Sequence, residues 1–89
     1  MRESGMRITL KLFATLEKYL PAARKAHNEA EVEVPDGASV ADVLRQFGVP
    51  REEVHLVLVD GRFMQADALE EVRLEEGQAL AVWPPVAGG

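Results

Sequence analysis

The first patterned part of the chain alternates apolar and polar side chains over residues 6–13, which predicts a half-buried β-strand. Residues 29–34 alternate in the same way, with alanine and valine on one side and glutamate on the other. The turn signal Pro-Asp-Gly at residues 35–37 ends this second strand. Between the strands, apolar side chains at helical spacing over residues 14–20 predict a short helical turn, and the polar residues 22–28 predict a loop.

One stretch in the middle of the chain has the spacing of an amphipathic α-helix, and both of its ends are marked. Ser39 is a favourable N-cap residue, and Asp42 three residues later completes the pattern of a capping box. Gly48 supplies a C-terminal stop and Pro50 forbids continuation, so we expect a helix of about ten residues. The apolar stripe of this helix consists of Val40, Val43, Leu44 and Phe47.

The second half of the chain predicts a hairpin and a final strand. Residues 56–59 form an uninterrupted apolar run, which suits a strand that is covered on both sides or flanked by neighbours. The Asp-Gly pair at residues 60–61 is a hairpin turn signal and predicts a short strand over residues 62–64. Residues 65–72 are ambiguous and include a candidate helical turn, whereas residues 79–83 form the last strand.

The order of elements is strand, strand, helix, strand, short strand, strand, and this order indicates the α+β class. One sheet with one helix across one face is the simplest way to bury the apolar stripes of both. We therefore predict a ubiquitin-like β-grasp fold, a mixed sheet of roughly four to five strands whose first and last strands are parallel at its centre. The domain then covers residues 6–83, residues 1–5 form a flexible leader, and residues 84–89 form an extended tail.

The end of the sequence has an unusual composition. Pro84 and Pro85 favour an extended start at about 3.1 Å per residue, and residues 84–89 reach on the order of 20 Å in total. Gly88 and Gly89 follow, and glycine lacks the Cβ that would keep a partner's backbone at a distance. A carboxylate on such a thread can enter a narrow channel in another protein, so we interpret the chain as a carrier. The alternative interpretation is a frayed end without function.

Composition narrows the range of partners. The chain has 89 residues, enough for one domain with one modest core. Its 15 acidic and 10 basic side chains give a net charge of −5, which disfavours a nucleic-acid partner and is compatible with a basic protein surface. The absence of cysteine excludes disulfides, thiolate metal sites and cysteine nucleophiles. Neither a membrane-spanning run nor a signal-peptide pattern is present, so we expect a cytoplasmic protein with no membrane partner.

The body of the chain carries no recognisable set of catalytic residues. The sequence has no phosphate-binding loop, no metal-ligand cluster and no nucleophile–base set, so we expect no bound cofactor and no metal. The glutamate pairs at residues 70–71 and 75–76 are interpreted as exposed turns. The three glutamates of residues 29–33 are interpreted as a solvated edge or, alternatively, as a docking stripe. A free carboxylate is a poor electrophile, and activation of the tail must therefore come from another protein.

Four segments resemble the MoaD/ThiS family of small ubiquitin-like sulfur carriers, and the resemblance extends over nearly all of residues 6–89. Residues 6–14 are similar to the first strand of the family, and residues 34–44 are similar to the start of its helix. Residues 58–61, Leu-Val-Asp-Gly, resemble its Leu-Val-Asn-Gly turn. The ending Trp-Pro-Pro-Val-Ala-Gly-Gly at residues 83–89 is the most specific segment. It resembles the MoaD branch, the small subunit of molybdopterin synthase, with tryptophan where phenylalanine is more usual.

The resemblance implies a defined chemistry for the tail. A ubiquitin-activating-like enzyme uses ATP to adenylate Gly89, and a sulfurtransferase or cysteine desulfurase then leaves a terminal thiocarboxylate. In the MoaD branch this end enters the large subunit of molybdopterin synthase and gives its sulfur to cyclic pyranopterin monophosphate. The chain itself acts there as the non-catalytic small subunit. The residues implied to bind partners are the tail residues Gly88, Ala87, Val86, Pro85 and Pro84 and, as docking positions, Trp83 and Phe13.

Other functions would use the same tail. The sulfur acceptor is alternatively a thiamine thiazole, a thiolated tRNA base or an amino-acid precursor. In another class, the chain is a ubiquitin-like modifier that forms isopeptide bonds through Gly89. A structural domain with an idle tail is a further alternative. Trp83 itself is interpreted either as core or strand-edge packing or as a partner contact.

Overall fold

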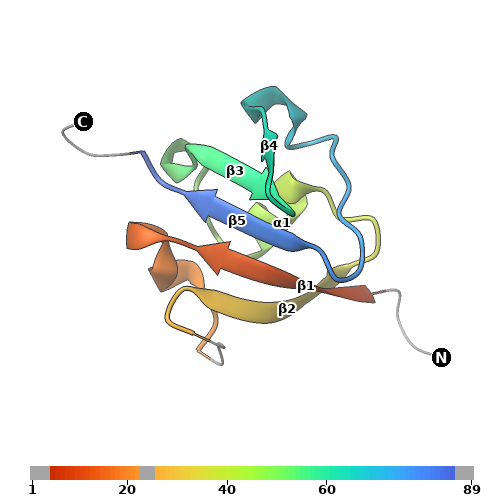
Figure 1. The fold of residues 1–89 in the computed structure, drawn as a ribbon, viewed down its shortest axis with the longest axis horizontal. Helices are drawn as coiled ribbons and strands as arrows, with labels where there is room; N and C mark the ends of the chain where they lie inside the picture. The colour runs from red at the N-terminus through yellow and green to blue at the C-terminus, as the bar shows by residue number, and fades with distance from the viewer. Residues whose placement is uncertain (1–4, 23–25, 86–89) are drawn as a thin grey trace.

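The computed structural model describes residues 5–22 and 26–85. In this described part, five strands form one sheet and one α-helix lies across one of its faces (Figure 1). The predicted α+β, ubiquitin-like β-grasp architecture is therefore confirmed. In chain order, with η for a 3₁₀-helix, the elements are β1 (Gly5–Leu12), η1 (Ala14–Tyr19), β2 (Glu29–Pro35), α1 (Val40–Gln46), η2 (Arg51–Glu53), β3 (Leu56–Val59), β4 (Arg62–Met64), η3 (Ala66–Ala68) and β5 (Ala79–Trp83).

The sheet is mixed and has the strand order β2-β1-β5-β3-β4. The first and last strands lie side by side and parallel, with Leu10 opposite Leu80, as the sequence predicts. Strand β2 runs antiparallel to β1 on one side, and β3 runs antiparallel to β5 on the other. Because β5 is paired along both edges, the segment that follows it is anchored at the middle of the sheet.

The predicted hairpin joins β3 and β4 and is fastened to the start of β5. Asp60 and Gly61 both have positive φ angles, 51° and 82°, which is the backbone of a type I′ turn. The backbone N–H of Asp60 donates to the carbonyl oxygen of Ala79 at 2.9 Å, and its carboxylate accepts from the N–H of Ala79 at 2.8 Å. These bonds fix the register of β5 against the hairpin.

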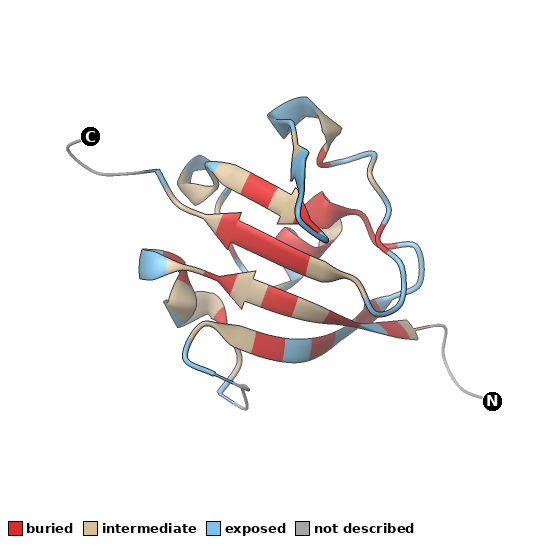
Figure 2. Ribbon diagram, in the orientation of Figure 1, coloured by how far each residue is buried: buried red, intermediate tan, exposed pale blue. Residues whose placement is uncertain are grey.

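The hydrophobic core lies between the sheet and α1, and the alternation in the sequence decides which side chains enter it (Figure 2). Ile8, Leu10 and Leu12 of β1 are at most 1% exposed. On β2, the alanine and the two valines are buried, and the glutamates between them face away. The other large side chains that are buried at less than 2% exposure are Leu16, Leu44, Leu69, Leu80, Val40, Val43, Val57 and Val82.

Helix α1 has 7 residues, so the expected length of about ten was too long. The helix ends early because Gly48, at a φ of 77°, closes it with a Schellman motif. The N–H of Gly48 donates to the Arg45 carbonyl oxygen at 3.1 Å, and the N–H of Val49 donates to the Leu44 carbonyl oxygen at 2.9 Å. Beyond Pro50 the chain forms η2, a turn that the sequence pattern did not reveal.

The N-terminus of α1 is closed by the predicted capping box. The hydroxyl of Ser39, a buried residue, accepts from the N–H of Asp42 at 3.0 Å, and the carboxylate of Asp42 accepts from the N–H of Ser39 at 3.0 Å. The N–H groups of Val40 and Ala41, which lie between these two residues, donate to carbonyl oxygens in the loop that follows η3, at 3.2 and 2.9 Å. The orphan donors of this helix end are thus satisfied, half of them by a segment far away in the sequence.

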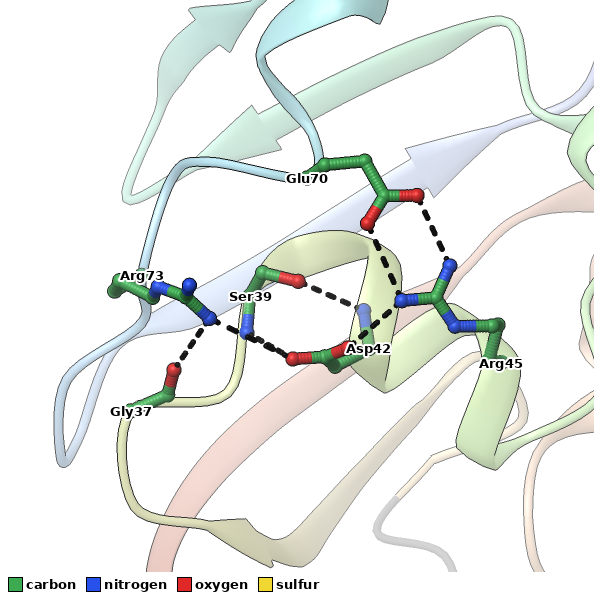
Figure 3. Close-up of polar contacts among 6 residues, drawn as sticks. All are labelled: Gly37, Ser39, Asp42, Arg45, Glu70 and Arg73. Carbon is green, nitrogen blue, oxygen red and sulfur yellow. Dashed lines mark hydrogen bonds and ion pairs between the residues drawn. The ribbon is translucent and has the colours of Figure 1, made fainter.

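A group of charged side chains fastens the same loop to α1 on the surface (Figure 3). Arg45 donates to Asp42 at 2.8 Å and to Glu70 at 3.0 Å, while Arg73 donates to the carbonyl oxygen of Gly37 at 3.1 Å. Hydrogen bonds from the Ser39 backbone and from Arg45 lower the pKa of Asp42, and Arg45 lowers the pKa of Glu70. The glutamate of the predicted exposed turn therefore has a structural partner across the loop.

Candidate functional site

The candidate site is the end of the sheet at which β5 stops and the tail begins. Trp83 is the last residue of β5, and its carbonyl oxygen accepts from the N–H of His55 at 2.8 Å. On the other edge, the carbonyl oxygen of Val82 accepts from the N–H of Phe13 at 3.1 Å. Both neighbouring strands therefore hold the final residues of β5. Residues 84–85 continue the chain beyond the end of the sheet (Figure 1).

Two aromatic rings are stacked at this end of the sheet. Phe13 and Trp83 have ring centroids 4.3 Å apart and an interplanar angle of 4°, and each residue is half-buried. Ala14, the next residue after Phe13, has a φ of 55°, a conformation that costs a residue with a Cβ about 1–2 kcal/mol. This turn leads the chain from β1 into η1. Trp83 thus lies at the end of a central strand and stacks on Phe13, so the structure brings together the two predicted docking positions.

The stacked pair continues into an apolar surface on the face of the sheet that α1 does not cover. Strand register places Leu56 opposite Trp83 and places Leu58 opposite both Ala81 and Phe63. Residues directly opposite one another share a face, because side chains alternate along each strand. Phe63 is 59% exposed, and Leu56 and Leu58 are half-buried. We call this surface the open-face patch; it consists of Phe13, Leu56, Leu58, Phe63, Ala81 and Trp83.

The predictions from the sequence gave no docking role to Leu56, Leu58 or Phe63. The apolar run of β3 gave no sign of which residues remain accessible, and Phe63 was expected only as part of a short strand. The hairpin pattern in the sequence could have indicated this pair, because a two-residue turn places Phe63 opposite Leu58. A large apolar side chain that is exposed beside other apolar ones is a typical feature of a binding surface.

The other half of the same face is polar. It is formed by Arg7, Thr9 and Lys11 of β1 beside the glutamates of β2, and Arg7 lies 3.9 Å from Glu31. Glu31 and Glu33 are exposed, as the interpretation of a solvated edge expects. The open face therefore divides into an apolar half next to the tail and a charged half away from it.

Over residues 5–22 and 26–85, no three histidine, aspartate or glutamate side chains are grouped so as to hold a metal ion. His27 is 80% exposed and lies 3.8 Å from Glu17. Tyr19 donates to Glu53 at 3.0 Å, and burial together with this acceptor raises its pKa. In the part of the chain described, no helix has the length and apolar character needed to cross a membrane.

The predicted tail lies only partly within the described residues. Pro84 is half-buried and Pro85 is exposed. The other tail residues that the sequence assigned to partners lie outside the described part, as do residues 1–4 of the predicted leader; Gly5 begins β1. The tail residues outside the described part are Val86, Ala87, Gly88 and Gly89.

A five-stranded mixed sheet with this strand order and one helix across it defines a ubiquitin-like β-grasp protein. The sequence profile of the Mut7-C ubiquitin family matches residues 5–88, and the chain belongs to this family. None of the curated proteins matches the chain in sequence.

Solved structures with the same fold include a protein named as a modifier and one named as a putative molybdopterin converting factor. The HVO 2177 protein of Haloferax volcanii has 27% identity and a TM-score of 0.76, and the match covers 100% of this chain and 92% of that one. SAMP1 (small archaeal modifier protein 1) of Haloferax volcanii has 25% identity and a TM-score of 0.64, covering 93% and 99%. A protein of Pyrococcus furiosus described as a putative molybdopterin converting factor, subunit 1, has 22% identity and a TM-score of 0.63, covering 91% and 99%. At this last identity the likeness shows the fold alone.

Proposed function

We propose that this protein is a ubiquitin-like sulfur carrier whose Gly89 carboxylate is activated and converted to a thiocarboxylate for molybdopterin biosynthesis. The observation that carries the proposal is the position of β5, the strand from which the tail continues. The strand that bears it is central, is held on both edges at Val82 and Trp83, and ends beside the open-face patch. A partner that binds the patch has the start of the tail within the same interface and receives the glycine end at a second, deeper site.

The proposed chemistry takes place on Gly89 and is catalysed elsewhere. An adenylating enzyme joins the carboxylate to the α-phosphorus of ATP, and pyrophosphate leaves. The terminal sulfur of a persulfide on a sulfurtransferase or cysteine desulfurase attacks the acyl carbon, and AMP leaves. A thiol reductant then cleaves the S–S bond of the resulting acyl disulfide and is itself oxidised to a disulfide. The resulting thiocarboxylate then enters the large subunit of molybdopterin synthase, where its sulfur passes to the pterin precursor. The carrier contributes a slender end, because Gly88 and Gly89 have no side chains to fill the channel.

The open-face patch supports a docking role for these partners. Aromatic and apolar side chains at the centre of an interface, with a polar rim, are the usual anatomy of a protein–protein contact. Here the stacked Phe13 and Trp83 together with Phe63 supply the aromatic centre, and the charged half of the sheet supplies one rim. The net charge of −5 favours partners with a basic surface around this contact and disfavours nucleic acid.

Protein modification is the second candidate function, and the similarity to SAMP1 favours it. In that case the activated Gly89 carbonyl is attacked by the neutral amine of a lysine on another protein, an isopeptide C–N bond forms, and AMP leaves. The same patch and the same tail serve this reaction. The two functions differ in the product at Gly89 and in the partner that receives it.

Intact-mass spectrometry of the protein purified from its native host separates these functions. A chain that ends at Gly89 with one oxygen replaced by sulfur supports the carrier, whereas conjugates linked to lysines without any thiocarboxylate support the modifier. A second measurement mixes the protein with the large molybdopterin synthase subunit of the same host. A stable complex supports the molybdopterin branch. If the thiocarboxylate is present but no complex forms, the carrier function stands and the sulfur acceptor is a different one.

A further inference from the structure

In the described part of the chain, two residues other than glycine have positive φ angles, Ala14 at 55° and Asp60 at 51°. The remaining positive-φ positions there carry glycine, which adopts this conformation without strain. Asp60 has a structural reason, because its carboxylate accepts from the N–H of Ala79 at 2.8 Å and from the side-chain amide of Gln78 at 3.3 Å. Ala14 carries only a methyl group and is exposed. Neither a side-chain hydrogen bond nor burial in the core therefore offsets the strain at Ala14.

Hydrogen bonds on both sides hold the backbone of Ala14 in this conformation. The N–H of Phe13 donates to the carbonyl oxygen of Val82 at 3.1 Å, and the carbonyl oxygen of Phe13 accepts from the N–H of Leu16 at 3.0 Å. The second bond closes a turn in which Ala14, the first central residue, has a positive φ and Thr15 does not. This is the pattern of a type II′ turn, in which glycine is preferred at the position of Ala14. Alanine loses less entropy than glycine on folding, but at a positive φ the strain exceeds that gain.

Ala14 lies at the end of the sheet where β5 stops. Its neighbour Phe13 stacks on Trp83 with ring centroids 4.3 Å apart, and η1, which begins with Ala14, lies at the same end (Figure 1). Gly89 is six residues beyond Trp83, and six residues span at most about 20 Å. An enzyme that acts on Gly89 must therefore bring its reactive centre within that distance of the stacked rings, and its surface around the tail lies against the residues beside them.

We propose that the methyl group of Ala14 is a contact for the adenylating enzyme that activates Gly89, and that it packs into an apolar depression of that enzyme beside the stacked rings. This inference rests on the proposed function. The adenylating enzyme is the partner because both the sulfur carrier and the protein modifier require it. Glycine would satisfy the turn at a lower free energy but would leave a gap of one methyl group in the contact. The chain thus keeps alanine where the turn alone favours glycine.

The test measures ATP–pyrophosphate exchange by the adenylating enzyme of the same host, with the full chain as the varied substrate. Removal of one methyl group from an apolar contact weakens binding by roughly three- to tenfold. We expect Ala14→Gly to raise the KM for the carrier by this factor and to leave kcat unchanged, because the contact is present in both the ground state and the transition state. The same variant should raise Tm by roughly 2–8 °C, since the strained turn is relieved. A purely structural role of Ala14 would change Tm without changing KM.

Two further variants separate the methyl contact from the effect on stability. Ala14→Asn keeps a residue that tolerates a positive φ but replaces the methyl group by a polar amide, so it should raise KM at least as much as Ala14→Gly. Gly77→Ala is the matched control, because Gly77 has a φ of 86° and precedes β5 at the opposite end of the sheet. A Cβ there would meet nothing within 4 Å. This control should lower Tm and leave KM unchanged.

The possible outcomes distinguish this contact from the proposed function. If wild type is adenylated but KM is unchanged in Ala14→Gly and Ala14→Asn, the proposal is overturned and the function stands. A KM that rises equally in Gly77→Ala, or a Tm that does not rise in Ala14→Gly, also overturns the proposal. If the KM values change as expected but Gly89 never receives sulfur, the sulfur-carrier function fails and the contact stands. If wild type supports no exchange, both are wrong.

Discussion

The stacked pair at the tail root should be a measurable unit of stability as well as part of the docking surface. Replacing a fully buried tryptophan or phenylalanine by alanine costs about 3–5 kcal/mol. Phe13 and Trp83 are each half-buried, so each single substitution should cost roughly half of that, about 1.5–2.5 kcal/mol. At about 4–8 °C per kcal/mol for a domain of this size, Tm should fall by roughly 6–20 °C.

A double-mutant cycle isolates the ring–ring contribution. With centroids 4.3 Å apart and an interplanar angle of 4°, the rings are close to a parallel stack. Such pairs contribute about 0.5–1.5 kcal/mol beyond their buried area. Urea unfolding of wild type, Phe13→Ala, Trp83→Ala and the double variant should therefore give a coupling free energy of this size. A coupling free energy near zero would refute the inference that the two rings stabilise each other.

Phe63→Ala is the matched control on the same face. Its side chain is 59% exposed and belongs to no stacked pair among the described residues, so its removal should cost about 1–2 kcal/mol, all of it from partial burial and none from ring stacking. Binding to the large molybdopterin synthase subunit, measured by calorimetry, should nevertheless weaken by about tenfold or more if Phe63 is a central contact. Unchanged affinity in both Phe63→Ala and Trp83→Ala would show that partners dock elsewhere.

Three further predictions concern the tail and the helix end. Deletion of Gly89 should abolish thiocarboxylate formation in an adenylation assay while Tm stays nearly unchanged; a large loss of Tm would mean that the end packs on the body. Ser39→Ala should lower the free energy of unfolding by about 1 kcal/mol, and Ser39→Gly by only about a few tenths, because alanine is the poorer N-cap; equal losses in urea unfolding would contradict the capping argument. The pKa values of Asp42 and Glu70 are lower in the folded chain than in the unfolded chain, where they are about 4. The two carboxylates therefore contribute fully to the free energy of unfolding above pH values of about 4, and this contribution is lost as the pH falls through the folded pKa values. Arg45→Gln should therefore reduce the stability difference between pH 7 and pH 3 in urea titrations, and an unchanged difference would count against this ion-pair group.

Much of the fold could be predicted because each local pattern has one dominant physical cause. The alternation of Ile8, Leu10 and Leu12 fixes a face, since successive side chains of a strand point to opposite sides. Ser39 and Gly48 mark helix ends through the hydrogen bonds and the backbone angle that those positions require. The helix was nevertheless overestimated, because the apolar stripe extends to Phe47, which is already the C-cap.

The candidate docking residues came from the resemblance and not from a local pattern, and their docking role stays a prediction. Phe13 and Trp83 were named as docking positions from the resemblance, and the structure stacks them at the root of the tail. Phe63 was missed, because its exposure depends on the hairpin register and on the absence of a sixth strand beside β4 in the described sheet. Whether Gly89 carries sulfur stays a prediction.

The sequence by itself determined the inward faces of β1, β2 and β5, the start of the helix and the turn at Asp60, because these follow from neighbours within a few residues. Tertiary structure alone decided which distant residues meet. Lys11 lies beside Ala81, and Arg45 binds Glu70, only because strand order and the loop after η3 bring them together. Side-chain alternation constrains each strand to two faces, but the order and register of the strands are chosen by the packing of the whole sheet against its helix.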